Sequence, residues 1–60
     1  MKWNVYRNTQ HPTTTPWLVV TDAMANALTI EGDAIVFYWS NLYDRRVVVS
    51  SREFYVVREG

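Results

Sequence analysis

The chain has 60 residues, with six basic and six acidic side chains, one histidine and no cysteine. This length predicts one domain, residues 1–60, and the lack of cysteine excludes disulfides and thiolate zinc sites. The balanced charge argues against a dedicated duplex-DNA binder, which usually carries a basic excess. No apolar run is long enough to span a membrane and no signal-peptide core is present, so we expect a soluble, cytoplasmic protein without cofactors.

Two strands are predicted in the first third of the chain. Residues 3–7 (WNVYR) alternate apolar and polar side chains, which is typical of a half-buried strand. The polar segment 8–16 contains two prolines, which disfavour helix in the residues before them, so we expect a loop. Residues 17–21 (WLVVT) form the second predicted strand.

The segment 22–28 (DAMANAL) fits two interpretations. It contains good helix formers and an N-cap candidate, so one short helical turn near 22–27 is possible, although such a turn is marginal without strong packing. We favour a bend at 22–25, followed by a strand over 27–31. Gly32-Asp33 then predicts a two-residue hairpin, which pairs strand 27–31 antiparallel with strand 34–40.

The remaining residues predict two more strands, 45–50 and 53–58, the first of them rich in valine. Asp22, Asp33 and Asp44 are evenly spaced, and each lies beside a predicted strand end. Turn signals at such regular spacing predict an all-β fold. We expect a small antiparallel meander of five or six strands, either SH3-like or a partly open barrel.

The strand 34–40 raises a question because both of its faces are apolar. The bulkier set, Ile35, Phe37 and Trp39, is expected to fill the interior. The other face would then be exposed, and exposed apolar patches tend to mark interfaces. If the next strand contributes to the same face, the predicted protein-interface residues are Val36, Tyr38, Arg46 and Val48.

No set of residues predicts catalysis or a metal site. The only histidine has no identifiable partner, and the carboxylates at the turns are favoured there for backbone reasons. The three tryptophans are more readily explained as core residues than as a ligand cage. We therefore expect a protein that is not an enzyme.

Arginines interleaved with aromatic residues suggest a second kind of surface. Such a surface can stack single-stranded nucleic acid, and the possible contact residues are Tyr43, Arg45, Arg46 and Tyr55. In the alternative interpretation, the arginines pair with Asp44, Glu53 and Glu59 on neighbouring strands.

The sequence shows two resemblances to known families. "LTIEGDAIVF" (28–37) is similar to the strand-turn-strand core of the swapped-hairpin transition-state-regulator antitoxins, and this implies a dimeric DNA-binding protein. "MKWNVYRN", "VVTDAMANALTIEGDAIVFY" and "REFYVVRE" resemble short orphan proteins of actinobacteria and their phages. This second resemblance implies a small accessory protein that acts by binding.

The leading functional hypothesis is a non-enzymatic protein-interaction module of phage origin. We expect it to bind a second copy of itself or a host or virion protein, and to have no contact with a membrane. The alternative is a small nucleic-acid-binding protein, which would use either the arginine and aromatic surface or the swapped-hairpin dimer.

Overall fold

The computed structural model describes residues 2–42 and 44–59. Within these ranges there are six strands and no helix, so the predicted all-β class is confirmed. The segment 22–24 is a turn, in which the Thr21 carbonyl accepts hydrogen bonds from the Met24 and Ala25 amides. The bend that we favoured over a helical turn is therefore confirmed. The strands are β1 (Lys2–Arg7), β2 (Leu18–Val20), β3 (Ala27–Glu31), β4 (Ala34–Trp39), β5 (Asp44–Ser50) and β6 (Phe54–Glu59).

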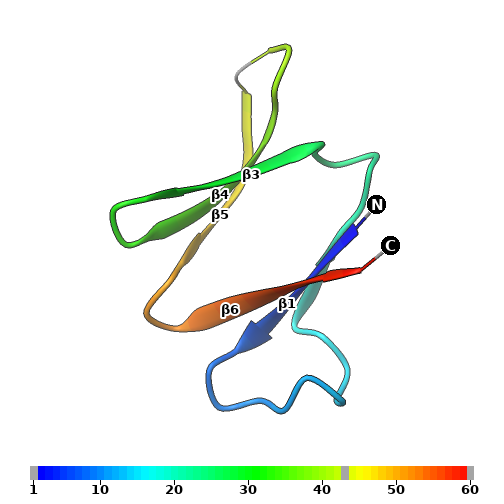
Figure 1. Ribbon diagram of the computed structural model, residues 1–60, viewed down its shortest axis with the longest axis vertical. Coiled ribbons are helices and arrows are strands. Elements are labelled where there is room, and N and C mark those ends of the chain that lie inside the picture. The colour runs from blue at the N-terminus through cyan, green and yellow to red at the C-terminus, as the bar shows by residue number, and fades with distance from the viewer. Residues whose placement is uncertain (1, 43, 60) are drawn as a thin grey trace.

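The strands form two antiparallel sheets of three strands each (Figure 1). The order is β2-β1-β6 in one sheet, which we call sheet A, and β3-β4-β5 in the other, sheet B. The sheets lie face to face but do not close into a barrel. The short turn after β5 leads the chain out of sheet B, and β6 then pairs along the whole length of β1.

The tight hairpin between β3 and β4 fixes the register of sheet B. Gly32 has a φ of 59°, a left-handed conformation that glycine adopts without the steric cost of a side chain. Ile30 pairs with Ile35 and Glu31 pairs with Ala34, so the turn contains only residues 32 and 33. The predicted two-residue hairpin is confirmed.

The core fills the space between the two sheets and follows from the alternation of side chains along each strand. Trp3 and Val5 of β1 face Ile35 and Phe37 of β4, and the Trp3 and Phe37 ring centroids are 5.5 Å apart. The expected inward direction of Ile35 and Phe37 is confirmed. The remaining buried members of this core are Val20, Ala25, Val49 and Phe54.

Two of the three tryptophans depart from the expectation that they belong to the core. Trp39, the last residue of β4, is only half-buried and lies outside the core cluster. Trp17 is 47% exposed because it precedes β2 at the rim of the molecule. Its ring packs on that of Phe54, with 4.5 Å between centroids.

Candidate functional site

Two of the predicted interface residues, Val36 and Val48, lie on the face of sheet B opposite the core. Val36 pairs with Val48, and both alternate with residues that point into the core. Val36, however, is only 1% exposed, so its prediction as an accessible interface residue is wrong. It lies on the central strand, and an ion pair between Glu31 and Arg45 joins the two flanking strands across it. Val48, on the edge strand, is 52% exposed.

The bulge also changes the rim of the predicted patch. Tyr38 stands opposite Arg45 and not Arg46, because the bulge falls between Phe37 and Tyr38. The Arg46 guanidinium instead lies 3.0 Å from a carboxylate oxygen of Asp44 on its own strand. Arg46 is exposed, and its ion pair lies within β5.

The predicted nucleic-acid contacts are not brought together. Arg45 and Arg46 lie on β5 in sheet B, whereas Tyr55 lies on β6 in sheet A. Tyr55 stacks on Tyr6 with 5.4 Å between ring centroids, and its hydroxyl donates to the Gln10 carbonyl at 2.7 Å. Tyr43, the remaining predicted contact, lies outside the described residues.

Several arginines pair with carboxylates, but these are not the pairs that the alternative interpretation named. Asp44 pairs with Arg46 on its own strand, and Glu59 pairs with Lys2. Besides the pairs of Arg45 and Arg46, the Arg52 guanidinium lies 3.1 Å from an Asp33 carboxylate oxygen. The Arg7 guanidinium instead lies over aromatic rings, 5.3 Å from the centroid of Phe54. This distribution of charge favours structural pairing over a concentrated phosphate-binding surface.

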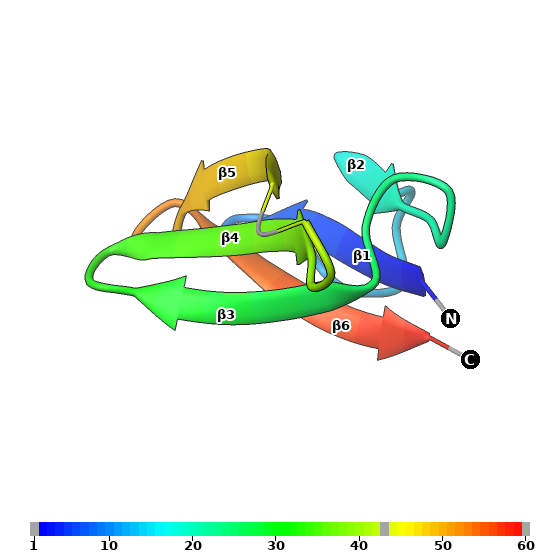
Figure 2. The ribbon, with the colours of Figure 1, turned by 90° about the horizontal axis from the view of Figure 1, so that it is seen from above.

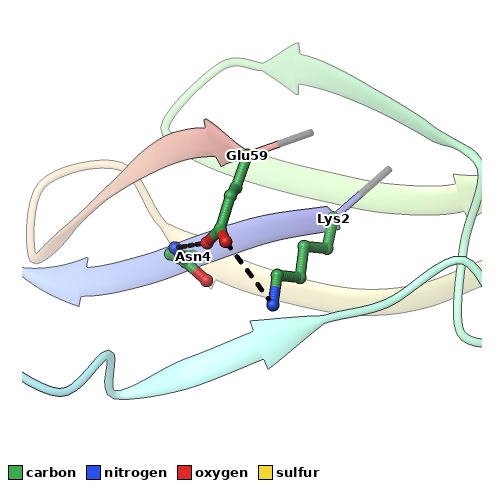
Figure 3. A network of polar contacts seen from close by, with 3 residues as sticks. All are labelled: Lys2, Asn4 and Glu59. Carbon is green, nitrogen blue, oxygen red and sulfur yellow. Dashed lines mark hydrogen bonds and ion pairs between the residues drawn. The ribbon is translucent and has the colours of Figure 1, made fainter.

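A small polar network joins the first and last strands (Figure 3). The Asn4 side-chain amide donates to a Glu59 carboxylate oxygen at 2.7 Å, and the Lys2 ammonium lies 3.6 Å from the other oxygen. The hydrogen bond from Asn4, followed by the positive charge of Lys2, lowers the pKa of Glu59. The network connects β1 to the end of β6 and has a structural role.

An apolar groove of about 400 Å³ lies between the two sheets, along β3 and β6. Both strands are at the edge of their sheets, so each has one side without a neighbouring strand. Ile30 is the most exposed apolar residue of this groove, at 58%. The residues that line the groove include Trp3, Leu28, Ile30, Ile35, Val56 and Arg58.

Sequence reasoning missed this groove, although one signal was present. Ile30 shares a strand face with Leu28, and so it belongs to the core-facing set of β3. Its exposure depends on β6, which is near enough to form the opposite wall but does not pair with β3. That arrangement follows from long-range pairing, which alternation along one strand does not specify.

No group of three or more potential metal ligands occurs among the described residues, and no buried side-chain nitrogen or oxygen in these ranges lacks a hydrogen-bond partner. No helix in the described part of the chain is long and apolar enough to cross a membrane. Comparisons with protein-family models, with curated proteins and with solved structures found no match.

Proposed function

We propose that this chain is a non-enzymatic protein-interaction module that binds through the groove between β3 and β6. The observation that carries the proposal is the 58% exposure of Ile30 on the core-facing side of an edge strand. An apolar side chain in that position gains most when another chain covers it. The resemblance to short phage proteins leads us to propose an accessory role, with a host or virion protein or a second copy as the partner.

The groove suits a protein segment better than a compact ligand. Small-molecule sites usually enclose most of the ligand surface. This groove is open along its length, and it is flanked by strand edges that can form backbone hydrogen bonds. Proteins commonly bind extended peptides by adding a strand to such an edge.

Two matched substitutions test this proposal. Ile30→Asp places a charge in the groove, and Val48→Asp places the same charge on the outer face of sheet B, at a residue of similar exposure (52%). We expect Ile30→Asp to abolish association, measured by sedimentation of the chain across micromolar concentrations and by quantitative capture of partners from host lysate. Val48→Asp should leave both measurements unchanged.

The thermal midpoints of both variants serve as the folding control. We expect both variants to remain folded, because both residues are more than half exposed. The proposed function would be contradicted if the chain is strictly monomeric and if it captures the same proteins with and without Ile30→Asp. Loss of association with Val48→Asp alone would move the binding surface to the outer face of sheet B.

A further inference from the structure

The directions of the two groove strands define the two ends of the groove. The Ser51 amide donates to the Asp33 carbonyl at 2.7 Å, so β6 begins close to where β3 ends. Figure 2 shows the arrows of β3 and β6 pointing in opposite directions along the molecule. Arg58, near the end of β6, therefore lies toward the end of the groove at which β3 begins.

Among the four sheet edges, β3 is the least protected against pairing with another strand. Native edge strands are usually kept unpaired by charged side chains or by short length. β2 has three residues, and β5 carries charged residues over 44–46. β6 carries two charges, Arg58 and Glu59, whereas β3 carries one, Glu31 at its last position. An incoming strand is therefore best accepted by β3.

A strand added to β3 would also cover the groove. Its alternate side chains would lie on the same side as Leu28 and Ile30, and apolar groups there would meet the lining from both sheets. Antiparallel pairing is the commoner arrangement and is slightly more stable per residue. In that arrangement the incoming strand runs in the same direction as β6, so its carboxyl end lies at the Arg58 end.

Arg58 is the only charged side chain among the described residues that line the groove. A guanidinium has five N–H donors and can form strong, charge-assisted hydrogen bonds with more than one partner, a carboxylate among them. A bound strand that continued beyond Arg58 would leave the groove, because the β3 wall starts at Leu28 and does not include Ala27, the first residue of that strand. The group that meets Arg58 is therefore at the end of the bound segment.

We propose that the groove binds the extended, apolar C-terminal segment of a partner protein, which pairs antiparallel with β3 and places its terminal carboxylate at Arg58. This inference rests on the proposed function and specifies its partner. Apolar side chains at alternate positions supply contact with the groove, and the carboxylate sets the direction and register of the segment.

The test is a titration of the ¹⁵N-labelled chain with synthetic peptides, in which binding is measured from the amide chemical shifts. The probe is acetyl-Lys-Thr-Val-Thr-Val-Thr-Val with a free carboxylate, and it is compared with the same peptide as a C-terminal amide. A third peptide ends in an amidated aspartate, which supplies a side-chain carboxylate. We expect the free acid to shift the amides of β3 and β6, and to bind on the order of tenfold more tightly than either amidated peptide.

Arg58→Gln should remove the preference for the free acid, while Arg46→Gln, at an exposed residue of β5 that does not line the groove, should keep it. Equal affinity of the acid and its amide for the unmodified chain would overturn the inference, and this comparison does not depend on the folding of a variant. Equally tight binding of the aspartate peptide would overturn the requirement for a chain terminus. No binding of any peptide at millimolar concentration would overturn the inference even if the Ile30→Asp experiment upheld the proposed function.

Discussion

Three successive residues of β4, Ile35, Val36 and Phe37, are buried, but in different surroundings. Phe37 has no exposed surface and packs against Trp3 between the sheets, whereas Val36 is buried on the opposite face, beside the Glu31–Arg45 ion pair. A central strand in a chain this small therefore hides both faces in different ways. Packing between two sheets covers one face, and long side chains from the flanking strands cover the other.

The burial of Phe37 leads to the first prediction. Phe37→Ala should lower the free energy of unfolding by about 3–5 kcal/mol, because it removes a fully buried ring and leaves a cavity between the sheets. Urea denaturation of the variant and of the unmodified chain measures this difference. Val48→Ala is the control and should change the free energy by less than about 0.5 kcal/mol. A loss below about 1 kcal/mol for Phe37→Ala would mean that this ring is not in the core.

Glu59 leads to a prediction about pH. Its pKa is lowered, so the carboxylate stabilises the folded chain at pH values above the ordinary range for glutamate. That contribution is lost as pH falls through the lowered pKa, when the proton neutralises the side chain. Asn4→Ala should move the pKa of Glu59 back toward the ordinary value, because it removes the largest cause of the shift. An NMR titration of the Glu59 carboxyl carbon measures this, and an unchanged pKa would show that the hydrogen bond in Figure 3 is absent in solution.

At the scale of elements, the long connection between β1 and β2 is held to the sheets at several points. The Trp17 amide donates to the Val5 carbonyl at 2.8 Å, and the Asn8 amide donates to the Glu53 carbonyl at 2.8 Å. The Tyr55 hydroxyl holds the middle of the loop through Gln10. The loop between these strands is polar in sequence, yet its position depends on contacts with the start of β6.

Tyr55→Phe tests this attachment while keeping the ring that stacks on Tyr6. The lost hydrogen bond should cost about 1 kcal/mol of stability. Amide hydrogen exchange should become faster in residues 8–16, with little change in β3 and β4. Faster exchange throughout the molecule would show instead that the hydroxyl supports the whole fold.

The sequence predicted the local elements of this fold better than their partners. The bounds of β3 and the two-residue hairpin were predicted correctly, because Gly32 lies between two strongly patterned strands. The pairing of β6 with β1 was not predicted, because alternation along a strand does not specify its neighbour. The bulge that separates Tyr38 from Arg46 carries no clear signal in the sequence.

The same limit explains the outcome for the candidate site. Val36 was predicted as accessible because alternation defines the face of a residue but not the side chains that cover that face. The groove at Ile30 was missed because its walls come from two strands that are distant in sequence and do not pair. Predicting either feature requires the arrangement of both sheets.

At the scale of the whole molecule, two small three-stranded sheets meet without closing into a barrel (Figures 1 and 2), and an apolar groove lies between them along β3 and β6. A closed barrel would have no free strand edges, whereas this arrangement keeps four. β2 is short, β5 and β6 carry three and two charged residues, and β3 carries one and lies beside the apolar groove. The groove between β3 and β6 is therefore the feature that connects the fold to the proposed interaction.

Hydrogen–deuterium exchange of the unmodified chain tests this connection most directly. The dilute chain alone is compared with the chain in its associated state, whether with a captured partner or with a second copy at high concentration. Association through the groove predicts that exchange slows in segments covering β3 and β6 and stays unchanged in β5. Slower exchange confined to β5, with β3 unaffected, would contradict the proposal that the groove is the binding surface.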